Sequence, residues 1–229
     1  AYPDPDWCEV MIERHRGPWA AVGSAVVNAN PASYLSWTNM LIAYGRWPET
    51  RVAGETRDIA RHNSTFKRDV LLSYGDRLEA LVSRSGGLFR AMHADGHRFY
   101  FEPRVRVRHV NPSTLASTVE LRIKAGRLYA STRARAGGWS RSRRALYVAG
   151  APLMPPLRLF RQQKELLGGR RGMAALRMIP ALVVGLVLDA VGQAVGYAAG
   201  AGATGDDLTL FEMDRFRHIT PQDRRELTT

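Results

Sequence analysis

The chain has 229 residues, of which 45% are hydrophobic, so its composition excludes a disordered protein and suits one or two domains. Its formal net charge is +12, and the single cysteine, Cys8, excludes an internal disulfide framework. The charge is concentrated, because 14 basic residues and one acid, Glu165, lie between Arg122 and Arg177. Such a stretch favours an anionic membrane face or a nucleic acid as partner.

Helices and strands alternate in the first part of the chain, which predicts a mixed α/β fold. Apolar residues at helical spacing, followed by glycine, predict three helices, at residues 7–16, 35–44 and 68–76. The apolar run at residues 19–28 predicts a buried strand, and the polar residues 48–68 predict a loop. Cys8 has no nearby His or Cys, so we expect it to be a small buried group.

A helix, a glycine and a long strand are predicted next. Leu88, Phe89 and Met92 form one apolar helix face, and Gly96 is placed to cap that helix. From residue 99 apolar and charged residues alternate, so Glu102 and three arginines should share the face opposite the phenylalanines and valines. Pro103 lacks an N–H group, which predicts an edge or a bulge there.

The second part of the chain reads as helices that suit a membrane. Residues 114–135 predict a basic amphipathic helix with its apolar face on or near Leu115, Val119, Ile123 and Leu128. Residues 143–167 mix apolar groups, arginines and three prolines, a composition that suits the membrane interface. The polar tail, residues 211–229, is expected to be exposed.

Residues 178–203 contain one charge, Asp189, and are long enough to span a bilayer. The alternative is a buried core helix beside a solvated basic segment. Gly192, Gly196 and Gly200 predict a flat face for close helix packing in a membrane, or else a flexible Gly/Ala stretch. Because a charged Asp189 is costly in hydrocarbon, an interfacial helix or a short hairpin rivals a full crossing.

Four stretches in order resemble the second half of a family 2 glycosyltransferase of the GT-A fold. They are "PDPDWCEVMIERHRGPWAAVGSAVVNANP", "HNSTFKRDVLLSYG", "LFRAMHADGHRFYFEP" and "VRVRHVNPS". The resemblance implies an α/β fold in which residues 1–113 form the acceptor-side part of the transferase domain. Residues 114–229 resemble the membrane-associating end of some bacterial members, with amphipathic and apolar helices.

The resemblance implies transfer of a sugar from a nucleotide-sugar donor to the hydroxyl of a lipid-linked or polysaccharide acceptor of the cell envelope. It also implies Mg²⁺ or Mn²⁺ to neutralise the diphosphate leaving group, with the main ligands upstream of this chain. Asp4 and Asp6 look like a metal motif, but they fall after that position, in a loop. The expected place is the cytoplasmic face of the cell membrane, with an anionic membrane and no nucleic acid as partner.

The family's catalytic acid would precede the helix that Gly96 ends, but this sequence has Ser83, Arg84 and Ser85 there. Glu79 is the nearest carboxylate and is the candidate general base, the alternative being an exposed helix acid. In some relatives a histidine at the place of His109 helps to bind the metal or the diphosphate. The alternative for His109 is a histidine satisfied at the end of a strand.

Four polar residues are candidates for acceptor or phosphate contacts: His62, Asn63, Lys67 and Arg68. For the first two the alternative is a loop in which Ser64 or Thr65 caps the following helix. For Lys67 and Arg68 the alternative is that both side chains are simply solvated.

Two further functions stay open. A non-catalytic membrane-binding module of the same ancestry would explain the missing acid, and this chain alone may lack activity as a C-terminal portion. A nucleic-acid-binding protein would explain the net charge of +12, although the basic residues lie among prolines and apolar residues rather than in a recognised motif.

Overall fold

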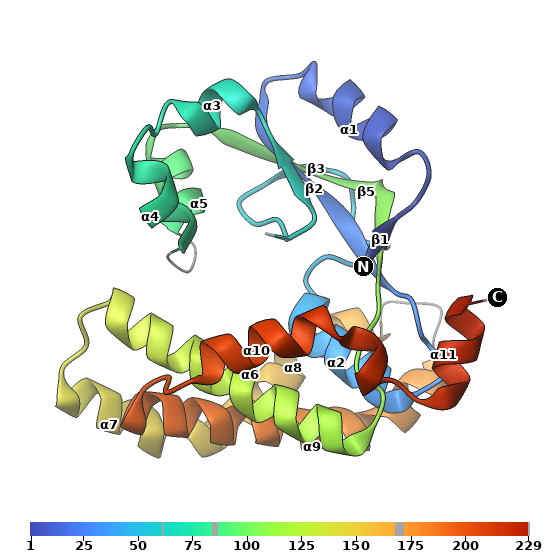
Figure 1. Cartoon of the computed structure of the whole chain (residues 1–229), viewed down its shortest axis with the longest axis vertical. Helices are drawn as coiled ribbons and strands as arrows, with labels where there is room; N and C mark the ends of the chain where they lie inside the picture. Colours follow the sequence, from blue (N-terminus) through green and yellow to red (C-terminus); the bar gives the residue numbers. More distant parts are fainter. Residues whose placement is uncertain (61, 84–86, 168–171, 229) are drawn as a thin grey trace. The chain divides into compact units, whose positions relative to one another are not determined.

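The computed structural model describes residues 1–60, 62–83, 87–167 and 172–228, and it is a mixed α/β chain with a curled mixed sheet and an apolar C-terminal helix, as predicted (Figure 1). It divides into two compact units. Unit 1 comprises Ala1–Val27 and Arg46–His109, and unit 2 comprises Asn28–Gly45 and Val110–Thr229. The division differs from the expected boundary at residue 113, because helix α2 (Tyr34–Tyr44) groups with the C-terminal helices.

Unit 1 is built on a five-stranded sheet in the order β1-β5-β2-β4, with β3 also paired to β5. The strands are β1 (Tyr2–Pro3), β2 (Trp19–Asn28), β3 (Gly54–Thr56), β4 (Ser64–Phe66) and β5 (Arg98–His109). Strand β5 pairs antiparallel with β3 at Phe99–Phe101 and with β1 at Val107 and Arg108. Pro103 falls between these two paired segments of β5.

Four helices accompany this sheet: α1 (Trp7–His15), α3 (Arg68–Leu72), α4 (Arg77–Ser83) and α5 (Gly87–Ala94). Met11 of α1 packs in one buried cluster with Val22 and Val105 of the sheet. The second buried cluster joins Phe99 to α5 through Met92. Gly96 has φ +81° and its N–H bonds to the carbonyl of His93, so it ends α5 as predicted.

Two expectations for unit 1 were wrong. Residues 48–68 contain β3 and β4, whose three-residue length is too short for an alternating pattern to be visible. Cys8 is exposed, since α1 turns its other face to the sheet. Glu102 bonds to Arg104, as expected for two residues on one face of β5, and it is buried because arginines cover its carboxylate.

Unit 2 is helical and is centred on one long helix, α9 (Gly172–Ala199), against which α2, α6, α7 and α8 pack. The other elements are α6 (Leu115–Ala136), α7 (Arg141–Ala149), η1 (Ala151–Leu153), α8 (Met154–Leu167), α10 (Thr204–Met213), η2 (Arg215–His218) and α11 (Pro221–Thr228). The buried apolar contacts of α9 with α2 involve Leu41, Leu182 and Leu186.

Helices α6 and α9 approach each other closely through glycine. A Cβ on Gly192 would lie 2.2 Å from the carbonyl oxygen of Ile123, and a Cβ on Gly126 would lie 2.3 Å from that of Asp189. Gly196 fits in the same way against Arg127. Two of the three predicted glycines, Gly192 and Gly196, therefore pack α9 on a helix, whereas Gly200 follows α9 with φ +81° and takes no part in this contact.

The apolar face predicted for α6 was wrong. Leu115 is 60% exposed, and the residues of α6 that are buried are mostly small or polar, with Arg122 among them. The reason is the close approach to α9, which admits glycine, alanine and serine where a leucine would clash.

The expectation of an exposed tail was also wrong in part. Ile219 and Asp223 are buried, and the hydroxyl of Ser113 donates to the Asp223 carboxylate. The backbone N–H of Ser113 bonds to the carbonyl of His218 at 3.0 Å. A few specific hydrogen bonds thus hold a mostly polar tail against the start of α6.

Candidate functional site

The residues predicted to contact acceptor or phosphate lie on both sides of β4. His62 is exposed, and Asn63 is buried with its carbonyl accepting from the Ser24 hydroxyl at 2.7 Å. The ammonium of Lys67 donates to the carbonyl of Gly17 at 2.9 Å, so part of its donor capacity is already used. Arg68 is exposed at the start of α3.

The suggested capping role of the neighbouring hydroxyls was wrong. Ser64 and Thr65 lie in β4, and the N-cap residue of α3 is Lys67, without a side-chain cap. The hydroxyl of Thr65 instead meets His15 Nε2 at 2.8 Å. Burial lowers the pKa of His15, and the nearby charge of Lys67 lowers it further. Hydrogen bonds to the backbone favour the charged ring and raise this pKa, but they do not outweigh the other two effects.

The candidate base and the candidate metal ligand lie on different elements. Glu79 is an exposed residue of α4, and its side chain has no hydrogen bond or ion pair to the described part of the chain. His109 is buried at the end of β5. Among the described residues no three His, Cys, Asp or Glu side chains form a metal-binding group. At the expected acid position Ser83 ends α4, and residues 84 and 85 lie outside the described residues.

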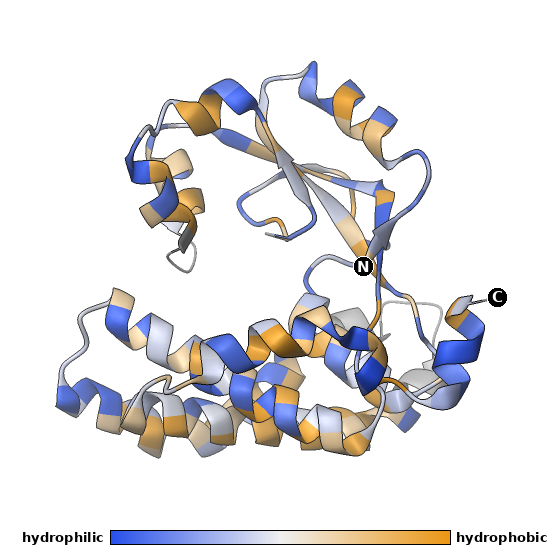
Figure 2. Ribbon diagram, in the orientation of Figure 1, coloured by the Kyte–Doolittle hydropathy of each residue, from blue (hydrophilic) through white to orange (hydrophobic). Residues whose placement is uncertain are grey.

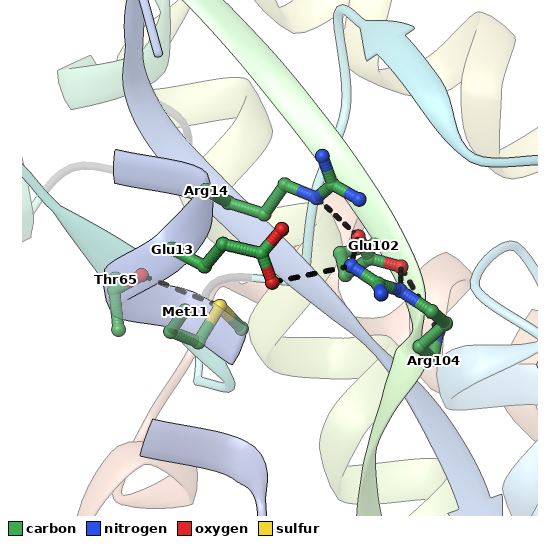
Figure 3. Close-up of polar contacts among 6 residues, drawn as sticks. All are labelled: Met11, Glu13, Arg14, Thr65, Glu102 and Arg104. Carbon is green, nitrogen blue, oxygen red and sulfur yellow. Dashed lines mark hydrogen bonds and ion pairs between the residues drawn. The ribbon is translucent and has the colours of Figure 1, made fainter. Parts of the chain in front are cut away.

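A four-residue ion-pair network connects α1 to β5 (Figure 3). The Arg14 Nε lies 2.5 Å from Glu102 Oε2, and Arg104 Nη2 lies 3.0 Å from the same oxygen. Glu13 reaches Arg104 at 3.8 Å. Burial alone would raise the pKa of Glu102, but hydrogen bonds from Arg104 and Arg14 outweigh it and lower that pKa. The network is neutral overall, so its role is to hold the helix on the strand.

Asp4 pairs with Arg106 and Arg108 of β5. Its two carboxylate oxygens accept from Arg106 Nε at 2.7 Å and from Arg108 Nε at 2.8 Å. Burial would raise the pKa of Asp4, but the hydrogen bonds from Arg108 and Arg106 prevail and lower it. Asp4 therefore completes a structural ion pair, which agrees with placing it outside the metal motif.

Asp189, the charged residue within the apolar helix α9, is buried in unit 2, where an arginine and a glutamine donate hydrogen bonds to its carboxylate. Its Oδ2 accepts from Arg158 Nη1 of α8 at 2.5 Å and from Gln193 Nε2 at 2.8 Å. Arg122 of α6 is also buried, which lowers its pKa to about 10 despite the nearby Asp189. Sequence reasoning missed both arginines, because neither α8 nor α6 showed which face would meet α9.

Two arginines that have no acidic partner among the described residues, Arg133 and Arg143, lie on an aromatic cluster at the α6–α7 junction. Trp139, Tyr147 and Tyr197 lie with ring centroids 4.4 to 5.5 Å apart. Arg133 and Arg143 stack on these rings, with Arg143 4.4 Å from the Trp139 centroid. The sequence explains the imbalance, because Glu165 is the single acid between residues 122 and 177.

The same unit exposes several large apolar side chains, and Figure 2 shows how hydrophobic residues are distributed along its helices. Along α9 one face presents five valines that are 36% to 48% exposed, at positions 183, 184, 187, 191 and 195. Leu146, Leu153 and Phe160, on α7, η1 and α8, are each more than two thirds exposed. We call the five valines and these three residues the apolar face of unit 2. Monomeric soluble proteins seldom expose so many large apolar side chains on neighbouring elements.

A polar pocket of about 440 Å³ lies between the start of α6 and the tail. In it the hydroxyl of Ser117 lies 3.0 Å from His218 Nδ1, and the His218 ring stacks on Phe211. Burial lowers the pKa of His218, against the raising influence of nearby acids. The sequence analysis did not predict this pocket, because Ser117 and His218 are about a hundred positions apart and no sequence pattern connects them.

Comparison with known proteins identified no match among family models, curated proteins or solved structures.

Proposed function

We propose that the chain is the C-terminal portion of a membrane-associated glycosyltransferase, and that unit 2 attaches it to the cytoplasmic face of an anionic membrane. The observation that carries the attachment is the apolar face of unit 2 next to arginines without acidic partners. Apolar side chains enter the acyl boundary while guanidinium groups meet lipid phosphates, the arrangement of interfacial helices.

The packing of α9 favours an interfacial position over a crossing. By length and composition Arg177–Ala199 could span a bilayer, with a mean hydropathy of 1.9, although the core helix of a soluble protein meets the same criteria. Helix α6 packs along α9 and carries Lys124 and Arg127 beside it. A crossing would take these charges toward the hydrocarbon at a cost of about 3 kcal/mol each.

The transferase part of the proposal is supported by the ordered resemblance of four stretches and by the order of α5, Gly96 and β5 in unit 1. In it a carboxylate takes the acceptor hydroxyl proton as the oxygen attacks the sugar of a nucleotide donor. Glu79 is the candidate within this chain. The resemblance assigns the main ligands of Mg²⁺ or Mn²⁺ to positions upstream of this chain, and His109 would add one ligand.

A second candidate is a non-catalytic membrane-binding module of the same ancestry. It is favoured by the environment of Glu79, which is exposed and has no partner in the described part of the chain. A general base works best where neighbouring groups hold it within hydrogen-bond reach of the proton that it takes. A free helix acid lacks that support.

Sugar transfer is tested with the complete reading frame, labelled nucleotide sugars and lipid-linked acceptors. The Glu79→Gln variant should lower the transfer rate by about 10²- to 10⁴-fold if Glu79 is the base. The control is Asp76→Asn, an exposed acid just before α4 that should leave the rate unchanged. Transfer by the parent with equal rates for both variants would remove Glu79 from the mechanism, and no transfer by the parent would favour the non-catalytic module.

Membrane attachment is tested separately by vesicle flotation of the chain. Val191, 48% exposed on α9, is replaced by lysine. Because the position is at the surface, the free energy of unfolding should change by no more than about 0.5 kcal/mol. Binding to vesicles of phosphatidylcholine with phosphatidylglycerol should fall. Unchanged flotation would show that the apolar face of unit 2 does not enter the membrane.

A further inference from the structure

A pocket of about 520 Å³ lies between α7 and the C-terminal end of α9 in unit 2. Helix α7 contributes residues 141, 144, 145, 148 and 149, whose spacing places them on one helix face. The α9 side consists of Tyr197 and Ala198. The pocket has a basic end, formed by Arg141 and Arg144, and an apolar end, formed by Val148 and the alanines.

One arginine of this pocket is fixed in place and still has donors to offer. The Arg144 Nε donates to the carbonyl of Tyr197 at 2.7 Å, at the C-terminal end of α9. In the described part of the chain its Nη1 and Nη2 have no partner, and Arg141 has no ion pair. Since Glu165 is the single acid between residues 122 and 177, α7 has no carboxylate to compete for these donors, and the one carboxylate of α6, Glu120, pairs with Lys124.

The surroundings hold the pocket rigid. Tyr197 is buried in the cluster with Trp139 and Tyr147, and Arg133 Nη1 bonds to its hydroxyl at 3.3 Å. Arg133 and Arg143 are occupied by stacking on these rings, unlike Arg144. A guanidinium that is anchored through Nε presents a planar pair of donors, which matches the oxygens of a phosphate.

We propose that this pocket binds the phosphate of a membrane lipid head group, with Arg144 and Arg141 on the phosphate oxygens. The glycerol and first acyl carbons lie along Val148 and Ala149. The neighbouring Leu146, 69% exposed on the same helix, then enters the acyl boundary. The proposal rests on the membrane attachment proposed above, but not on sugar transfer. A lipid is favoured over a nucleic acid because exposed apolar side chains, such as Leu146, lie on the same helix as the two arginines.

The test measures binding of the full chain to phosphatidylcholine vesicles containing phosphatidic acid, or phosphatidylglycerol at matched surface potential. Phosphatidic acid presents an uncovered phosphate, so the parent should prefer it. Arg144→Gln should lose this preference and bind phosphatidic acid vesicles more than about tenfold more weakly. The matched control is Arg135→Gln, which removes a charge at the exposed end of α6 outside the pocket. It should lose about fivefold on both vesicles and keep the preference.

A second variant separates binding from folding. Ala149→Trp fills the pocket without changing charge, and its added apolar area would by itself strengthen vesicle binding. A loss of the phosphatidic acid preference by this variant, with an unchanged circular dichroism spectrum, supports the site. Equal behaviour of Arg144→Gln and Arg135→Gln overturns the site and leaves membrane attachment standing, whereas no vesicle binding by the parent overturns both. Competition by soluble glycerol phosphate alone, or an equal loss of oligonucleotide binding in Arg144→Gln, would also overturn the lipid assignment.

Discussion

The contact between α6 and α9 predicts that alanine at Gly192 destabilises unit 2, although alanine is the better helix former. The added Cβ would lie 2.2 Å from the carbonyl oxygen of Ile123 and 2.9 Å from its carbonyl carbon. Comfortable contacts between heavy atoms need about 3.5 Å, so the two backbones must separate by roughly 1 Å. Because the obstacle is backbone, no side chain can rotate away to relieve the overlap.

The magnitude follows from two opposing effects. Overpacking of this kind costs about 1–3 kcal/mol, and replacing glycine by alanine within a helix returns up to about 1 kcal/mol. The Gly192→Ala variant should therefore lose about 1–2 kcal/mol of unfolding free energy. For a chain of this size each kcal/mol corresponds to a fall in Tm of about 2–4 °C.

The control is Gly205→Ala in α10, where an added Cβ meets nothing within 4 Å. This change should stabilise the protein by about 0.4–1 kcal/mol, because it reduces the freedom of the unfolded chain. Both variants are compared by thermal unfolding followed by far-ultraviolet circular dichroism, which reports mainly on the helices. If Gly192→Ala raised Tm as Gly205→Ala does, the close packing of α6 on α9 would be refuted.

Two further predictions concern ion pairs. Asp189→Ala leaves Arg158 half-buried without its partner and should lower the free energy of unfolding by about 3 kcal/mol, measured by urea unfolding. The double variant Asp189→Leu with Arg158→Met should restore most of the lost stability. Equal stabilities for the single and the double variant would mean that the pair is not formed. Glu102 has a pKa lowered below its ordinary value of 4.5, so the stability that it contributes is fully present above that pH and is lost as pH falls through the lower folded-state pKa. Glu102→Gln should thus be less stable than the parent at about pH 7, and it should lose less stability on acidification to about pH 3. If the free energy of unfolding fell with pH in parallel for the two proteins, the ion-pair network would be contradicted.

The sequence by itself determined the local elements that carry a strong signal. The helix that ends at Gly45, the apolar strand β2 and the α5–Gly96–β5 unit were all predicted, because periodicity and glycine positions act within a few residues. The face shared by Gly192 and Gly196 was also predicted, since a spacing of four residues places them on one side of any helix. Composition likewise located the positive charge between Arg122 and Arg177.

Only the tertiary structure decided which partners meet. Arg158 pairs with Asp189, and Asp4 reaches arginines on β5 that are more than a hundred residues away. The short strands β3 and β4 exist because β5 and β2 offer backbone partners, not because of their own propensity. Leu115 was expected to be buried and Arg122 was not, because burial on α6 is set by how closely α9 approaches and not by hydrophobicity. Side-chain patterns specify which groups avoid water, but long-range contacts depend on chain closure that no local pattern encodes.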